Sequence, residues 1–215
     1  INVQDDKLDQ HIEDALAAIG EFCHADRSYV FLFNADLTEM SNTHEWVRGG
    51  ISSHKAKLQK IPQQALPYFY QKIQQDLVFA VNDVASLPAE AAAEQHEFNT
   101  EDIQSVLCCA MLNNDKLSGF VGCDMVSRQR NWTSNDLRRM KLVGEMIGVG
   151  LHIIGRYPFR AFQRIIDVAG RFVEAVGRTH GFDEMRGVVF FVRENDRGFH
   201  RALGPDRPHR PQQRD

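Results

Sequence analysis

The sequence lacks a hydrophobic run anywhere near the roughly 20 apolar residues that a membrane-spanning helix requires, so we expect no membrane span. It also lacks a charged segment followed by an apolar stretch at its start, the pattern of an export signal. The chain begins at Ile1, and we interpret it as a fragment of something longer. Without an export signal, we expect its cysteines to be reduced and the protein to be cytoplasmic.

Catalytic and metal-binding signatures are also missing. The four cysteines form no Cys-X-X-Cys pair, and the nine histidines are scattered without metal-ligand spacing. There is no G-x-S-x-G elbow, P-loop, H-E-x-x-H motif or kinase string. We therefore expect a chain that is not an enzyme and holds no metal, and nothing in the sequence identifies a cofactor.

The composition is that of a soluble globular protein, with 43% hydrophobic and 25% charged residues. The net charge of −4 argues against a general nucleic-acid binder. Residues 151–215 differ from the rest, because all their basic residues are arginines. We predict one domain over residues 1–155 and an Arg-rich extension over 156–215. The extension would contain a helix within 159–176, a short strand at 188–192 and a disordered end.

Hydrophobic spacing predicts the order of elements in the first domain. Terminal helices are expected over 6–24 and from Thr133 or Ser134 onward, the second with a capping residue. Strands are expected at 28–34, 38–47, 77–81, 105–112 and 116–126. Shorter helices are expected from Pro62 and over 88–98. This order predicts an α+β fold with a mostly antiparallel sheet. The terminal helices would cover one face, and the excursions between residues 48 and 103 would cover the other and enclose a cavity.

Six stretches in this order carry a family resemblance: Ala15–Asn34, Met40–Ile51, Ile61–Pro88, Ile103–Leu112, Leu117–Val126 and Asn131–Gly148. Together with the segments around them they resemble a GAF domain, a sensor module of signalling proteins. The Ser41–Trp46 segment, Ile61-Pro62 and Leu66-Pro67 are similar to bacterial GAF domains attached to diguanylate cyclases and histidine kinases. The resemblance implies a central sheet, a ligand pocket on its loop-covered face and a homodimer formed through the terminal helices.

The resemblance leaves the ligand open. GAF domains that bind cyclic nucleotides carry an Asn-Lys-Xaa-Phe-Asp-Glu type motif, which this sequence lacks. In phytochrome-type members an Asp-Ile-Pro string and a loop cysteine serve the bilin. Here Asn82-Asp83-Val84 stands near the expected string, and Cys23 lies in the predicted first helix.

We predict that seven residues bind the ligand. Alternation along the strand places His44 and Trp46 on one face, where the indole would stack on a planar ligand. Tyr68 and Phe69 would form a lid over the cavity. The full predicted set is His44, Trp46, Tyr68, Phe69, Asp83, Cys108 and Asp124.

Each of these residues also has a purely structural interpretation. His44 and Trp46 would be a surface histidine and a sheet-edge aromatic. Tyr68 and Phe69 would be ordinary core. Asp83 would cap a turn. Cys108 would be a small buried hydrophobe opposite residues 120–121 of the next strand, and Asp124 would face solvent.

These expectations lead to one principal functional hypothesis and two alternatives. The first is a non-catalytic sensor whose unknown ligand biases the terminal helices and so controls an output domain outside this chain. The second is a structural dimerisation module whose pocket is filled by side chains. The third is a small enzyme resembling the GAF-type free methionine sulfoxide reductases, which use cysteine chemistry.

Overall fold

The computed structural model describes residues 3–154, and the expectations for residues 156–215 lie outside this range. The elements follow the predicted order. They are α1 (Val3–Phe22), β1 (Arg27–Phe33), β2 (Glu39–Val47), β3 (Ile61–Pro62), α2 (Pro67–Gln75), β4 (Val78–Val81), α3 (Ala92–Thr100), β5 (Ser105–Asn113), β6 (Lys116–Met125) and α4 (Ser134–Ile154). Short 3-10 turns stand at Gln63–Ala65, Val84–Ser86 and Ala89–Ala91. No helix of this range is long and apolar enough to cross a membrane.

Most boundaries differ from the prediction by one to four residues, and the largest difference lies at Pro62, where the two-residue strand β3 was not predicted. The helix expected to begin at Pro62 begins at Pro67 instead. Pro62 has an extended backbone (φ −74°, ψ 150°), and it pairs with Glu39 of β2. Both prolines are compatible with the first turn of a helix. Only Pro67 is followed by residues with helical spacing, Phe69 and Ile73, that are buried against the sheet.

The six strands form one sheet in the order β3-β2-β1-β6-β5-β4, and every neighbouring pair is antiparallel. The central strands β1 and β6 are buried on both faces, as the uninterrupted apolar run of β1 predicts. Alternate side chains of each central strand therefore pack against the elements on opposite faces of the sheet. A shift of one of these strands would affect the packing on both faces.

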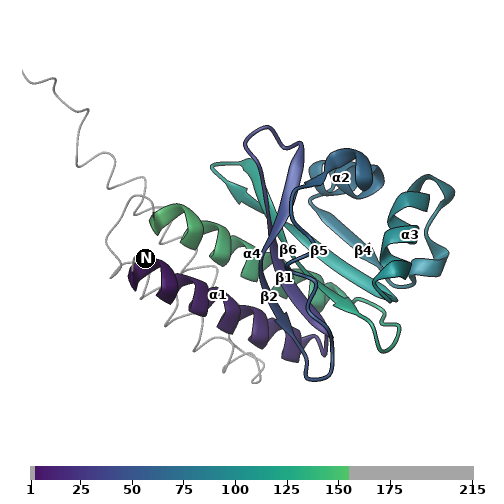
Figure 1. Ribbon diagram of the computed structural model, residues 1–215, viewed down its shortest axis with the longest axis horizontal. Helices are drawn as coiled ribbons and strands as arrows, with labels where there is room; N and C mark the ends of the chain where they lie inside the picture. The colour runs from purple at the N-terminus through teal and green to yellow at the C-terminus, as the bar shows by residue number, and fades with distance from the viewer. Residues whose placement is uncertain (1–2, 155–215) are drawn as a thin grey trace, which may run out of the picture. The chain divides into compact units, whose positions relative to one another are not determined.

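The sheet separates two hydrophobic layers. Helices α1 and α4 lie against one face, and α2, α3 and the coil between β2 and β3 lie against the other (Figure 1). Leu16 of α1, Val30 of β1 and Met140 of α4 belong to the first layer. Phe31 of β1, Phe69 of α2 and Phe98 of α3 belong to the second. This arrangement confirms the predicted α+β fold, with terminal helices on one face and excursions covering the other.

A β-bulge in β2 changes which side chains face which layer. Val30 pairs with His44 and Phe31 pairs with Asn42, so Thr43 is an extra residue on β2. One additional residue reverses the alternation of side chains beyond it. Met40, before the bulge, faces the second layer, and Trp46, after it, packs in the first layer with α1.

Candidate functional site

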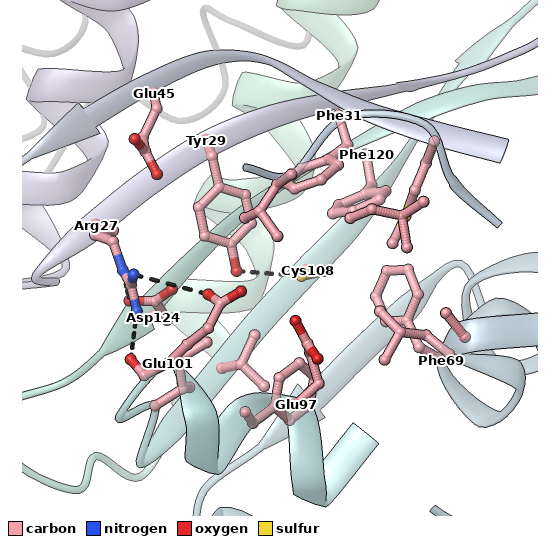
Figure 2. Close-up of a pocket in the computed structure, with 18 of the residues that line it drawn as sticks. Arg27, Tyr29, Phe31, Glu45, Phe69, Glu97, Glu101, Cys108, Phe120 and Asp124 are labelled. Carbon is pink, nitrogen blue, oxygen red and sulfur yellow. Dashed lines mark hydrogen bonds and ion pairs between the residues drawn. The ribbon is translucent and has the colours of Figure 1, made fainter. Parts of the chain in front are cut away.

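A cavity of about 180 Å³ lies between the sheet and its loop-covered face (Figure 2). Strands β1, β5 and β6 form its floor, and α2, α3 and the coil after β2 cover it. Its wall is mostly apolar, with charged side chains gathered at one end. The lining residues are Arg27, Tyr29, Phe31, Met40, Glu45, Lys57, Leu58, Ile61, Ala65, Leu66, Phe69, Glu97, Phe98, Glu101, Ile103, Val106, Cys108, Phe120 and Asp124.

Tyr29 reaches the cavity because β6 has a glycine opposite it. Tyr29 pairs with Gly122, where a Cβ atom would lie 2.4 Å from the tyrosine ring. The missing side chain lets the ring lie over the β6 backbone. The hydroxyl of Tyr29 lies 3.8 Å from the sulfur of Cys108, within a weak hydrogen-bond distance. Burial raises the pKa of Tyr29 well above its ordinary value, so its hydroxyl stays protonated.

Arg27 organises the charged end of the cavity. Its side chain is only 2% exposed, and its Nε donates to Oδ1 of Asp124 at 3.0 Å. Its Nη2 donates to the backbone carbonyl of Glu101 at 3.0 Å. Its Nη1 lies 2.9 Å from Nδ1 of His54 and 3.7 Å from Oε2 of Glu101. The guanidinium thus joins β1, β6 and the end of α3 (Figure 2), and through His54 it also contacts the covering coil.

Asp124 is a buried carboxyl whose charge is only partly compensated. Burial raises its pKa to about 7, although the adjacent Arg27 acts in the opposite direction. The nearby carboxylates of Glu101 and Glu45 raise it further. Burial lowers the pKa of Arg27, but Asp124 and Glu101 outweigh this effect and raise it overall. Arg27 therefore stays charged, while Asp124 titrates near neutral pH.

The coil between β2 and β3 is held over the cavity by Glu45. Its Oε2 accepts hydrogen bonds from the backbone N–H groups of His54 (3.1 Å) and Lys55 (3.2 Å). The hydroxyl of Ser53 also donates to this oxygen. Further along, the N–H of Asn42 donates to the carbonyl of Leu58 at 2.8 Å. These contacts tether a segment without regular structure as a roof.

The structure brings together three of the seven predicted site residues. Phe69, Cys108 and Asp124 all line the cavity, on α2, β5 and β6 respectively. Phe69 lies against Phe120, with ring centroids 4.9 Å apart. Asp124 is buried beside Arg27, so the alternative in which it faces solvent is wrong.

The predicted placement of His44 and Trp46 in the cavity is wrong. Because of the bulge at Thr43, both point toward α1 on the opposite face. Trp46 lies against Gly20, where a Cβ atom would come within 2.4 Å of the indole. Nε2 of His44 lies 3.0 Å from Oδ1 of Asp9 in α1. Their neighbour Glu45, which the prediction put on the other face, is the residue that reaches the cavity.

Tyr68 and Asp83 also lie outside the cavity wall. Tyr68 contacts Phe79 at the outer side of α2, with ring centroids 6.4 Å apart, and borders a separate surface groove beside β4. Asp83 caps the turn at Val84–Ser86, where its Oδ1 accepts from the N–H of Ala85 at 3.0 Å. Asp83 therefore has the turn-capping role given above as its structural interpretation.

Sequence reasoning missed Arg27, Glu45 and Glu101. Arg27 is a charged residue at the start of a strand whose next residues are buried, and Asp124 is a charge within another such strand. Two opposite charges at the ends of buried strands are a usable signal of an internal ion pair. Glu101 carried no such signal, because it follows a helix whose position over the cavity depends on tertiary contacts.

The cysteines divide between the two layers. Cys108 lies at the cavity, and the other three are buried in the first layer. Cys108 pairs with Gly122 rather than with residues 120–121, so Cys123 stands opposite Leu107. Burial raises the pKa of Cys109 to about 12, and it raises that of Cys108 even more. Such thiols hold little reactive thiolate.

No group of three or more histidine, cysteine or acidic side chains within residues 3–154 is arranged to hold a metal ion. The cavity presents aromatic faces, buried charges and the half-buried carboxylate of Glu97. It does not combine an activated nucleophile with a general base, because its cysteine is kept protonated by burial.

Comparisons with known proteins agree with this architecture. The GAF domain family model matches residues 7–151. The chain is 30% identical over 149 residues to the methanogenesis regulatory histidine kinase FilI of Methanothrix harundinacea. This match covers 66% of this chain but only 16% of that protein. The chain thus spans about one sixth of the length of that relative.

Solved structures show the same fold at low sequence identity. The blue-light absorbing PixJ GAF domain of Thermosynechococcus elongatus has a TM-score of 0.58 and 14% identity, covering 84% of this chain and 99% of that one. The phycocyanobilin-bound GAF domain of a cyanobacterial phytochrome has a TM-score of 0.56 and 16% identity, covering 67% and 84%. The match of the family model over most of the chain, together with this shared fold, shows that the chain belongs to the GAF domain family.

Proposed function

We propose that this GAF domain is a non-catalytic sensor that binds a small molecule in the cavity between the sheet and α2, α3 and the covering coil. The observation that supports the proposal is the partly enclosed cavity itself, with aromatic walls and a buried charged end. Ligand sites have this composition: mostly apolar lining with a few placed polar groups. The ligand would control an output domain of a bacterial signalling protein, of the histidine kinase or diguanylate cyclase type, beyond this chain.

The central strands supply a physical route from the cavity to the terminal helices. On β1, Tyr29 and Phe31 line the cavity, while Val30 packs in the layer that contains α1. The hydroxyl of Ser28, also on β1, donates to the carbonyl of Leu16 in α1 at 2.7 Å. A ligand that displaces the two aromatic side chains therefore shifts a strand bonded to α1. Only a difference in affinity between two arrangements can drive such a signal.

Two other functions have less support. A structural dimerisation module would have a cavity filled by side chains, whereas about 180 Å³ stays open here. A methionine sulfoxide reductase would need a reactive thiolate near the substrate. Cys108 alone reaches the cavity, and burial raises its pKa above its ordinary value.

Native mass spectrometry of the purified chain, compared with the same sample denatured, tests the proposal. We expect a non-covalent small-molecule mass on the folded protein. Leu58→Trp, on the covering coil, should abolish the retained mass because the larger ring occupies the cavity. Leu77→Trp is the matched control, since Leu77 is exposed and lies outside the cavity.

The proposal fails if the wild-type chain carries no retained mass and no small molecule of any charge raises its melting temperature. It also fails if Leu58→Trp and Leu77→Trp retain the ligand equally. The first result would favour the dimerisation module, and the second would place the ligand elsewhere.

A further inference from the structure

The cavity is surrounded by aromatic rings from several elements. The rings of Phe31 and Phe120 are stacked, with their centroids 4.9 Å apart and an angle of 8° between their planes. The ring of Phe69 packs edge-to-face with that of Phe120. Figure 2 shows these rings on two sides of the open space. The five aromatic residues of the wall are Tyr29, Phe31, Phe69, Phe98 and Phe120. The faces of such rings carry negative electrostatic potential and attract cations.

The charges that line the cavity add to this potential. Four carboxyl side chains line it, Glu45, Glu97, Glu101 and Asp124, against two cationic ones, Arg27 and Lys57. Arg27 is already engaged by Asp124, Glu101 and His54. Lys57 is exposed to solvent. The cavity therefore has an excess of negative charge and little cationic capacity left for an anionic ligand.

Glu97 is the carboxylate best placed to meet a ligand. It lies on α3, is half-buried, and points into the open space beneath Cys108 (Figure 2). Its carboxylate has no hydrogen-bond or ion-pair partner among the described residues. Glu101 and Glu45, by contrast, are both occupied, the first by Arg27 and His54 and the second by the covering coil. A half-buried carboxylate without a partner is a natural counter-charge for a bound cation.

We propose that the ligand is a small organic ammonium ion, held by the aromatic wall and by the carboxylate of Glu97. This inference rests on the proposed sensor function and adds its ligand chemistry. The volume of about 180 Å³ limits the ligand's size. A cavity of about 150 Å³ holds one benzene ring, so the space suits a methylated ammonium head group or a single ring with a short amine.

Isothermal titration calorimetry with matched probes tests the charge of the ligand. Choline is compared with its neutral carbon isostere 3,3-dimethylbutan-1-ol, and phenethylamine with 2-phenylethanol. Titrations use the full chain freed of any retained molecule. We expect at least one ammonium probe to bind about tenfold more tightly than its neutral partner, because cation–π attraction and Glu97 act on the charge alone.

Glu97→Gln keeps the shape of the side chain and removes its charge. We expect this variant to weaken binding of the ammonium probe several-fold and to leave the neutral alcohol unchanged. Glu90→Gln is the control, because Glu90 is an exposed acid in the turn before α3 and does not line the cavity. It should bind both probes as the wild type does.

The outcomes separate this inference from the proposed function. If an alcohol binds as tightly as its ammonium partner, or if Glu97→Gln and Glu90→Gln behave alike, the ammonium assignment is wrong while the sensor function stands. If no ammonium probe binds and the mass retained in the native spectrum is that of a neutral or anionic compound, the same conclusion follows. If nothing binds and nothing is retained, both fail.

Discussion

Trp46 packs its indole against α1 at Gly20, on the face of the sheet away from the cavity. We therefore expect Trp46→Ala to lower the free energy of unfolding by about 2–4 kcal/mol, because it leaves a hole between α1 and β2. Ligand retention by the folded fraction should be unchanged. Urea denaturation and native mass spectrometry measure the two effects. If the variant loses the ligand but keeps its stability, Trp46 contributes to ligand binding and its assignment to the other face is wrong.

Asp124 is expected to make the stability of the protein depend on pH. Its pKa is raised to about 7 by burial, so between about pH 4 and pH 7 the folded state binds a proton that the unfolded state releases. Stability relative to Asp124→Asn should therefore be greatest near about pH 4 and fall as the pH rises through about 7. Melting temperatures of both proteins across this range measure the difference.

The control for this titration is Asp115→Asn, an exposed acid in the turn between β5 and β6. Because the side chain of Asp115 is exposed, this substitution should change the melting temperature little. Parallel curves of melting temperature against pH for Asp124→Asn and the wild type would mean that Asp124 keeps an ordinary pKa in the folded protein, and that Arg27 compensates its charge fully.

At the scale of elements, α2 depends on α3 for its N-terminal cap. Leu66 offers no side-chain cap, and Oε1 of Glu94 in α3 instead accepts from the N–H groups of Tyr68 (2.8 Å) and Phe69 (3.1 Å). The carboxylate also meets the positive end of the helix dipole. Because Glu94 is fully buried, this contact fixes the two helices that cover the cavity relative to each other.

We expect Glu94→Ala to lower the free energy of unfolding by about 1–3 kcal/mol, since it leaves the buried N–H of Phe69 and the partly buried N–H of Tyr68 without an acceptor. Glu94→Gln keeps one carbonyl oxygen and should lose less. Urea denaturation measures both, with the exposed Glu90→Ala as the control. If Glu94→Ala and Glu90→Ala are equally stable, water or another group caps α2.

At the scale of the whole molecule, we propose a homodimer formed through the terminal helices. His11, Ala15, Ala18 and Phe22 follow one another along α1 at spacings of three and four and are half-buried. Arg139 of α4 lies over the ring of Phe22, 3.7 Å from its centroid, so this stripe borders the seam between the two helices. Small residues at such a seam leave room for a partner helix.

Light scattering coupled to size-exclusion chromatography should give twice the chain mass of 24.5 kDa. Ala18→Glu should shift the mass to that of one chain, because it places a charge where a second copy packs. Ala35→Glu, in the exposed turn after β1, should stay dimeric. A wild-type mass of one chain would contradict the proposed dimer.

The amino-acid sequence by itself determined the order of elements and the two-layer plan. The spacing of three and four in α1 and α4, and the uninterrupted apolar run of β1, are local patterns, and each predicts which surfaces must be covered. Phe69 and Cys108 could be assigned to the cavity because such patterns place them on α2 and β5. The GAF family was indicated separately, by the resemblance of sequence stretches such as Met40–Ile51 and Ile61–Pro88 to GAF domains.

Tertiary structure alone decided the composition of the site. The bulge at Thr43 exchanges the faces of His44 and Glu45, and such a bulge is set by pairing with β1 rather than by any signal in β2. The ion pair of Arg27 with Asp124 joins positions 97 residues apart. Glu97 and Glu101 reach the cavity only because α3 packs over the sheet. Local periodicity reports which side chains must be buried, but only packing between distant segments decides which of them meet.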